Sequence, residues 1–211
     1  IATDGYTAYM EMAAASGLTL VAENERNPMM ATTYGVGEMI ADAMQQGCKK
    51  IVMGIGGSAT CDGGKGMVEA LHNCGLLSSN AIKDTKIVVA CDVDNPLYGE
   101  NGAAYIFAPQ KGATKEDVEV LDKRLRSFAH DTELLGIATP ATALQQGTGA
   151  AGGLGYALLA YLKAELKAGI EIMLDIANFD NTIKDADIVV TGEGKSDHQT
   201  MMGKVAHGVM K

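Results

Sequence analysis

Asp92 and Asp94, two aspartates separated by one residue, directly follow a run of apolar residues and are candidates for a catalytic or metal-binding role. On an extended segment alternate side chains point the same way, so we expect both carboxylates to face one cleft. Such a pair can hold Mg²⁺, or it can divide into a general base and a metal ligand. Both uses suit phosphoryl transfer, which needs positive charge on the transferring phosphate and an oriented hydroxyl nucleophile. The alternative is that the two aspartates only shape the turn before Asn95 and Pro96.

A glycine-rich segment, residues 56–64, is the second candidate and has the sequence GGSATCDGG. Its four glycines allow sharp turns and a close approach of the backbone to a ligand. Ser58 and Thr60 add hydroxyl donors, and the helix expected next directs its positive N-terminus at the segment. The segment therefore predicts a carboxylate or phosphate site that includes Gly56, Gly57, Ser58 and Thr60. A tight turn without a ligand is the alternative, although such a turn needs fewer glycines.

A further glycine-rich segment, residues 147–155, contains a GxGxxG spacing that begins at Gly147. In nicotinamide-dinucleotide sites this spacing follows a strand, but residues 141–146 are not strand-like. A nucleotide-dependent oxidoreductase is therefore kept only as an alternative function. We expect instead a phosphate cradle at the start of a helix, and the competing interpretation is close packing through small residues. The candidate phosphate-binding residues here are Gly149, Gly152 and Gly153.

Charged residues near the end of the chain form the last candidate. Glu193 and Asp197 follow an apolar run and are predicted metal or substrate ligands, and Lys195 is a predicted phosphate contact. The letters GKS at 194–196 resemble the end of a Walker A motif, but Val189 stands where that motif requires glycine. A solvated charged turn is the alternative.

The elements that must position these segments alternate between helix and strand. Apolar runs predict buried strands, and helical spacing of apolar residues predicts helices between them. This alternation indicates an α/β fold with a largely parallel sheet, in which ligands bind at the carboxyl ends of the strands. The strands are expected at residues 50–55, 86–91 and 187–191, and the helices at 7–16, 36–47 with Gly47 as its end, 65–73, from the N-cap Thr114 past Phe128, 154–167, and from 203 to the end.

The composition excludes several classes of protein. The chain has 211 residues and a formal net charge of −9, which argues against a general nucleic-acid binder. It has no apolar run of about 18 residues, so no membrane span is expected. The four cysteines lack metal-site spacing, and reduced thiols in the cytoplasm are the simplest interpretation. The start shows neither an initiator Met nor a signal-peptide pattern, so we expect a piece of a longer protein. The oligomeric state is left open.

Five segments, in order, resemble bacterial-type glycerate kinases of the first family, and two short matches at 12–18 and 26–28 precede them. The resemblance covers almost the whole chain and is far more specific than any one glycine motif. The five segments are GIGGSATCDGG at 54–64, ACDVDNPL at 90–97, PQKGA at 109–113, GAAGG at 149–153 and TGEG at 191–194.

The resemblance implies two α/β domains around a cleft. One is flavodoxin-like and built from the two chain ends, and the other is inserted between them. Residues 1–184 would be mainly the inserted domain, and residues 185–211 the start of the return into the flavodoxin-like domain. The chain is expected to be truncated at both ends, and it is shorter than the family between Leu71 and Lys86.

The resemblance also implies transfer of the γ-phosphate of ATP to D-glycerate, with Mg²⁺ as the metal ion. Asp92 and Asp94 would be the catalytic and metal-binding residues. Arg26 and Asp62 would join the substrate-binding residues of the first glycine-rich segment. Lys195 replaces a usual arginine, and its ammonium does not make the bidentate contact of a guanidinium. A non-catalytic, anion-binding fragment is a further alternative.

Overall fold

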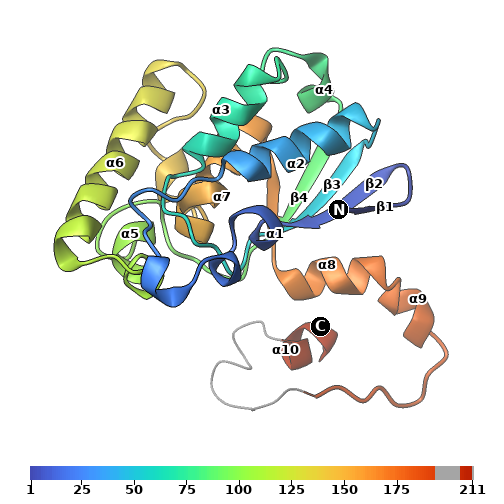
Figure 1. Ribbon diagram of the computed structural model, residues 1–211. Coiled ribbons are helices and arrows are strands. Elements are labelled where there is room, and N and C mark those ends of the chain that lie inside the picture. Colours follow the sequence, from blue (N-terminus) through green and yellow to red (C-terminus); the bar gives the residue numbers. More distant parts are fainter. Residues whose placement is uncertain (193–204, 211) are drawn as a thin grey trace. The chain divides into compact units, whose positions relative to one another are not determined.

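The computed structural model describes residues 1–192 and 205–210 and divides into two compact units, Ile1–Leu166 and Lys167–Lys211. Figure 1 shows helices and strands alternating along the first unit. The expected α/β class is confirmed. Within the described ranges no helix has the length and apolar character that spanning a bilayer requires. The division into a flavodoxin-like and an inserted domain stays a prediction.

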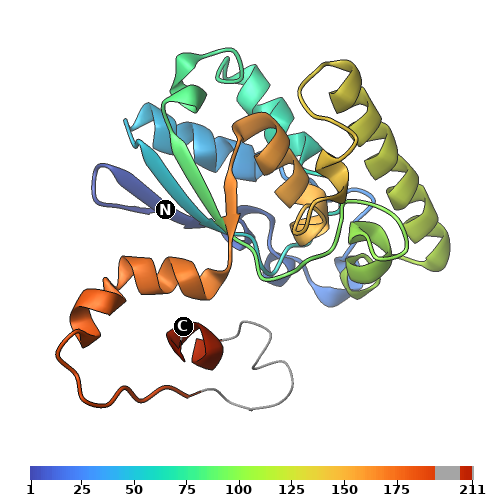
Figure 2. The same ribbon diagram turned by 180° about the vertical axis from the view of Figure 1, so that it is seen from behind.

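The first unit is built on a five-stranded sheet in the order β1-β2-β3-β4-β5. β1 is antiparallel to β2, whereas β2, β3 and β4 are parallel and in register from Thr7, Lys50 and Lys86 onward. β5 lies beside β4 (Figure 2). The carboxyl ends of three parallel strands therefore meet at one end of the sheet. The strands are β1 (Ala2–Thr3), β2 (Thr7–Glu11), β3 (Lys50–Gly54), β4 (Lys86–Ala90) and β5 (Glu165–Lys167).

The chain forms helices of two sizes. The longer ones are α2 (Tyr34–Gln45), α3 (Lys65–Asn73), α6 (Lys115–Leu134), α7 (Ala150–Leu162) and α8 (Gly169–Ile176). The shorter ones are α1 (Ala13–Ser16), α4 (Asn80–Lys83), α5 (Ala103–Phe107), α9 (Phe179–Ile183) and α10 (Val205–Met210). Single 3-10 turns occur at η1 (Leu18–Leu20), η2 (Glu23–Glu25), η3 (Pro109–Lys111) and η4 (Thr142–Leu144).

Two apolar clusters hold the first unit together. One joins β2, β3 and β4 to α2, α3 and α7, with Ile40, Met53 and Leu158 fully buried. The other joins α5, α6 and α7 around Leu125 and Tyr156. Because α7 contributes to both clusters, it links the sheet to the α5 and α6 layer. The burial of these large side chains is the main favourable term for folding.

Several local predictions are confirmed. β3, β4 and α3 form where the apolar runs and helical spacing placed them, and α2 is followed by Gly47 with φ +89°. The Thr114 hydroxyl accepts a hydrogen bond from the backbone N–H of Asp117, and the Asp117 carboxylate accepts from the backbone N–H of Thr114. This capping box starts α6 and satisfies two otherwise unpaired donors.

Two predicted elements are wrong. Residues 7–11 were predicted as helix, but Thr7–Glu11 forms β2, and only Ala13–Ser16 is helical. Residues 187–191 were predicted as a buried strand, but they are irregular, and Ile188 and Val190 are 80% and 90% exposed. The reason is the same in both cases: a strand exists only where a neighbouring strand accepts its hydrogen bonds, and local sequence does not show that neighbour.

One further helix ends earlier than predicted, and another agrees with its prediction over the residues that the structure describes. The helix predicted for residues 154–167 ends at Leu162, because Lys163 takes the left-handed conformation with φ +53°. Glu165–Lys167 then forms β5, and Glu165 pairs with Lys86 of β4 at 3.3 Å. The terminal helix predicted from residue 203 agrees with α10 over Val205–Met210, and its predicted start lies outside the described residues.

The start of α7 is a left-handed turn made by Ala151, Gly152 and Gly153, with φ of +53°, +68° and +92°. This turn lies against the first glycine-rich segment, since the backbone N–H of Gly63 donates to the Gly152 carbonyl at 3.0 Å. A Cβ on Gly152 would lie 2.0 Å from the carbonyl oxygen of Thr60. Glycine is therefore required here both by the backbone conformation and by the close approach of two chain segments.

We predict that Gly152→Ala destabilises the protein far more than Gly136→Ala. The two glycines have nearly the same φ, +68° and +69°, so the strain of a left-handed alanine, about 1 kcal/mol, is common to both. Only at Gly152 does the new Cβ meet backbone atoms, since nothing lies within 4 Å of one built on Gly136. Overpacking adds about 1–3 kcal/mol. Urea unfolding measures both variants, and equal losses would contradict the steric explanation.

Candidate functional site

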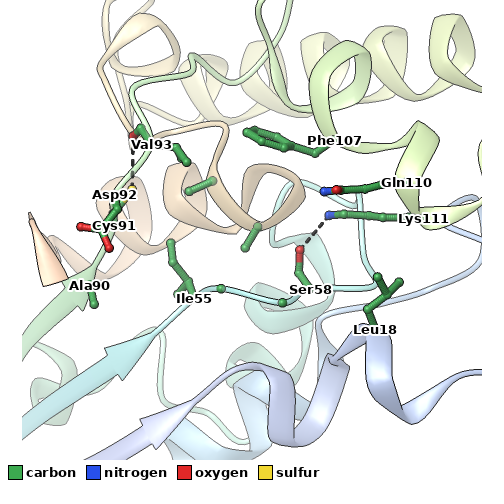
Figure 3. Close-up of a pocket in the computed structure, with 14 residues that line it drawn as sticks. Leu18, Ile55, Ser58, Ala90, Cys91, Asp92, Val93, Phe107, Gln110 and Lys111 are labelled. Carbon is green, nitrogen blue, oxygen red and sulfur yellow. Dashed lines mark hydrogen bonds between the residues drawn. The ribbon is translucent and has the colours of Figure 1, made fainter. Parts of the chain in front are cut away.

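A cavity of about 420 Å³ lies at the carboxyl ends of β3 and β4 (Figure 3). Its wall consists of four segments that are distant in the sequence. The segments are Ile55 to Ser58 after β3, Ala90 to Val93 at the end of β4, the residues Phe107, Gln110 and Lys111, and the pair Ala150 and Ala151. Leu18 completes the wall. The cavity therefore lies where an α/β sheet is expected to bind its ligand.

The first glycine-rich segment contributes Gly56, Gly57 and Ser58 to the wall, and their predicted role in binding an anion stays a prediction. The segment is held by residues at and just after the end of α1: the backbone N–H of Leu18 donates to the Gly57 carbonyl at 2.8 Å, and that of Ala59 donates to the Ser16 carbonyl at 2.9 Å. Gly57 has φ +71°, a conformation that glycine adopts without strain. These contacts fix the backbone while both glycines stay exposed to the cavity.

Lys111 is the buried cation of the site. Its side chain is only 2% exposed, and its ammonium donates to the Ser58 hydroxyl at 2.7 Å and to the Thr60 carbonyl at 2.6 Å. Burial lowers the pKa of Lys111 to about 8, and the neighbouring Cys61 and Asp62 act in the opposite direction. A charged group in this position is costly unless it is hydrogen-bonded, as it is here.

No role was predicted for Lys111 from the residues themselves. Its only signal was its place in the PQKGA segment at 109–113, one of the family-like blocks. Lysines are among the least buried residues in proteins, so nothing in the local pattern indicated that this one faces a cavity. Its position at the end of η3 is set by Gly112, whose φ of +96° lets the backbone turn against the carbonyl of Arg26.

The two aspartates after β4 are placed differently. Asp92 lies on the wall of the cavity, whereas Asp94 is not among the residues that line it. The segment 91–96 is irregular and not extended as a strand, so the alternation that would direct both carboxylates to one side does not apply. The Cys91 thiol, held near the carbonyls of Val93 and Gly147, also lines the cavity, and burial raises its pKa.

Asp62 lies outside this cavity and ties two segments together. Its carboxylate accepts hydrogen bonds from the backbone N–H and the hydroxyl of Thr33, both at 2.8 Å. It also accepts from the backbone N–H groups of Gly64 at 3.0 Å and Gly66 at 3.2 Å, at the start of α3. A carboxylate at a helix N-terminus is stabilised by these donors and by the helix dipole.

Two other predicted substrate-binding residues also lie off the cavity wall. Thr60 is 1% exposed; its carbonyl accepts from Lys111, and its hydroxyl has no hydrogen-bond partner among the described residues. The Nε atom of Arg26 is buried and likewise has no partner in the described part of the chain. Both residues contact the site through their backbones: Thr60 holds Lys111, and Arg26 packs against Gly112.

The glycines of the second segment are buried packing positions. The backbone N–H of Gly149 donates to the Asn95 carbonyl at 2.8 Å, and Gly152 and Gly153 pack against residues 60–63. The alanines between them, Ala150 and Ala151, line the cavity instead. The chain before this segment forms the 3-10 turn η4 and not a strand, so the structure provides no support for a nicotinamide site.

The last group of predicted ligands was Glu193, Lys195 and Asp197. All three lie outside the residues that the structure describes. Their predicted roles stay predictions.

The chain matches the model of the Glycerate kinase family over residues 1–75 and 76–211. This chain belongs to the glycerate kinase family. It is 47% identical to the glycerate kinase of Bacillus subtilis (strain 168), an alignment that covers 99% of this chain and 60% of the relative. It is 44% identical to the glycerate 2-kinase of Escherichia coli (strain K12), with the same coverage of both chains.

The likeness extends to three dimensions. A crystal structure assigned as a glycerate kinase 2 from Salmonella typhimurium LT2 matches with a TM-score of 0.85 and 41% identity, over 99% of this chain and 62% of that one. The chain thus spans about 60% of the length of these family members. The two matched family segments meet at Gly75 and Leu76, inside the region expected to be shorter than in the family.

We predict that Asp62→Ala lowers the free energy of unfolding by about 3 kcal/mol, because it leaves the buried Thr33 hydroxyl and three backbone N–H groups without their acceptor. Asp131→Ala is the matched control. Asp131 and Asp62 both line a second cavity, separate from the one at the ends of β3 and β4, but Asp131 is exposed. We expect this control to stay within about 0.5 kcal/mol of the wild type in urea unfolding. Similar small losses in both variants would show that the Asp62 network is not structural.

Proposed function

We propose that the protein containing this chain transfers the γ-phosphate of ATP to D-glycerate. The observation that carries the proposal is the cavity at the ends of β3 and β4, which combines the glycine-rich backbone, the Lys111 ammonium and the Asp92 carboxylate in a member of the glycerate kinase family. Support comes from the relatives, which are named glycerate kinase and glycerate 2-kinase. A small anion with hydroxyl groups fits this set of donors and acceptors.

Within this proposal, Asp92 orients the hydroxyl that attacks the phosphate. Asp92 lies on the wall, and a carboxylate accepts the hydrogen bond of a hydroxyl nucleophile and then its proton. Gly56, Gly57 and Ser58 hold the anionic part of the substrate with backbone and hydroxyl donors. The Asp62 network keeps the other end of the same segment attached to α3, so that the loop geometry is fixed before the substrate binds.

The proposal includes Mg²⁺. The described residues contain no group of three or more His, Cys, Asp or Glu side chains placed to hold a metal ion by themselves. Mg²⁺ in kinases is typically held by one or two carboxylates together with phosphate and water oxygens, so Asp92 on the wall fits such an ion. Asp92 would help to hold the ion, which would neutralise charge that develops on the phosphoryl group.

We also propose a cytoplasmic location. All four cysteines are free thiols, and two of them, Cys48 and Cys61, are buried. Burial raises the pKa of Cys61 to about 11, so this thiol stays protonated at physiological pH. Unpaired thiols are typical of a reducing compartment.

We predict that the complete protein releases ADP from ATP in the presence of D-glycerate, and that Asp92→Asn lowers kcat by about 10²- to 10⁴-fold with a smaller change in KM. The amide keeps the shape of the carboxylate but does not accept a proton. Asp84→Asn, the same change at an exposed residue after α4, is the control and is expected to retain wild-type turnover.

A coupled ADP-release assay with D-glycerate, lactate and glycerol measures these quantities. Glycerate binding without any turnover would favour a non-catalytic anion-binding protein. Full activity of Asp92→Asn would remove Asp92 from the reaction and leave the family assignment intact.

A further inference from the structure

We propose that Lys111, together with Ser58, binds the carboxylate of the organic-acid substrate. This inference rests on the proposed function and adds to it the residue that selects an acid over a neutral polyol.

The distribution of charge in the cavity is the first observation. Among the described residues that line the cavity, Lys111 and Asp92 are the charged ones, and the rest of this wall is apolar or neutral. In Figure 3 the Lys111 ammonium lies beside Ser58, and Asp92 lies on the opposite side of the cavity. The positive charge is therefore at the Lys111 end, where a single carboxylate can bind.

The unusual cost of burying Lys111 is the second observation. Both groups that accept its hydrogen bonds, the Ser58 hydroxyl and the Thr60 carbonyl, are neutral. Within the described residues no carboxylate forms an ion pair with its ammonium, the nearest acidic influence being that of Asp62. A neutral donor would satisfy the two acceptors at a much smaller desolvation cost. An anionic ligand supplies the missing negative charge and gives the buried cation a function.

Unused donors around Lys111 are the third observation. A lysine ammonium has three N–H bonds, and two of them are used inside the protein. The Ser58 hydroxyl accepts from Lys111 and keeps its own proton for donation. The backbone N–H groups of Gly56 and Gly57 have no acceptor among the described residues. Four donors therefore remain at one end of the cavity, enough for the oxygens of one carboxylate.

The electrostatics make the inference testable in the unmodified protein. With a pKa of about 8, Lys111 is charged below that pH and neutral above it, so carboxylate binding should be strong at pH 7 and weaken as the pH rises through 8. The other titratable groups near the site are Cys61, Cys91, Asp62 and Asp92. Burial raises the pKa of Cys61 to about 11 and also raises the pKa of Cys91.

Equilibrium binding without ATP tests the proposal. Calorimetric titration of the complete protein with D-glycerate is compared with D-glyceramide, its neutral amide, at pH 7 and pH 9. We expect the affinity for D-glycerate to fall about tenfold between these values, following the charged fraction of Lys111, and the affinity for D-glyceramide to stay constant. Identical glycerate affinities at the two pH values would overturn the proposal, and this measurement needs no variant.

Lys111→Met is the matching variant, and Lys115→Met, which removes one positive charge from an exposed position on α6, is its control. We expect Lys111→Met to weaken D-glycerate binding about 10- to 100-fold at pH 7 and to leave D-glyceramide binding nearly unchanged, since only the charge-assisted contact is lost. Equal weakening of D-glycerate and D-glyceramide binding would show that Lys111 has a structural role and does not recognise the carboxylate. Loss of ATP binding with retained glycerate binding would place a phosphate, and not the carboxylate, at Lys111.

The outcomes separate this inference from the proposed function. Glycerate binding that depends on neither pH nor Lys111 overturns only the role of Lys111. Carboxylate binding that depends on Lys111, in a protein without ATP-dependent turnover, overturns only the kinase proposal. No glycerate binding at any pH overturns both.

Discussion

The burial of one ammonium group organises the cavity. Lys111 has almost no contact with solvent, so its charge must be met by hydrogen bonds inside the protein, and both of these end on the segment that follows β3. The bonds to Ser58 and Thr60 therefore connect the layer formed by α5 and α6 to the sheet. Together with the backbone bonds to Ser16 and Leu18, this connection fixes the shape of the glycine-rich segment and the position of the donors on that wall.

Close approach of backbones is the second constraint, and glycine makes it possible. Gly152 at the start of α7 lies against Thr60, and Gly149 lies against Asn95 and Pro96 after β4. Side chains at these positions would push apart the segments that form the cavity. The glycines that first suggested a phosphate cradle thus act as packing positions, and they let Ala150 and Ala151 form part of the wall.

An acidic protein can bind an anion when the positive charge is local and partly desolvated. The chain carries a net charge of −9, yet the end of the cavity at Lys111 presents an ammonium, a hydroxyl and backbone N–H groups. Electrostatic interactions over such short distances in a region of low dielectric exceed the screened effect of distant surface charges. Net charge therefore argues against extended polyanions such as nucleic acids, but not against a small organic acid.

The sequence by itself determined the α/β class, the strands β3 and β4, the helices α2, α3 and α6, and the family, because these follow from local periodicity, capping residues and ordered motifs. It also indicated Gly56, Gly57, Ser58 and Asp92 as parts of a site. Only the tertiary structure decided that Thr7–Glu11 is a strand, that Asp92 reaches the cavity while Asp94 does not, and that Lys111 is its cation. Strand pairing, side-chain direction in an irregular segment and the burial of a lysine all depend on partners distant in the chain, which no local pattern contains.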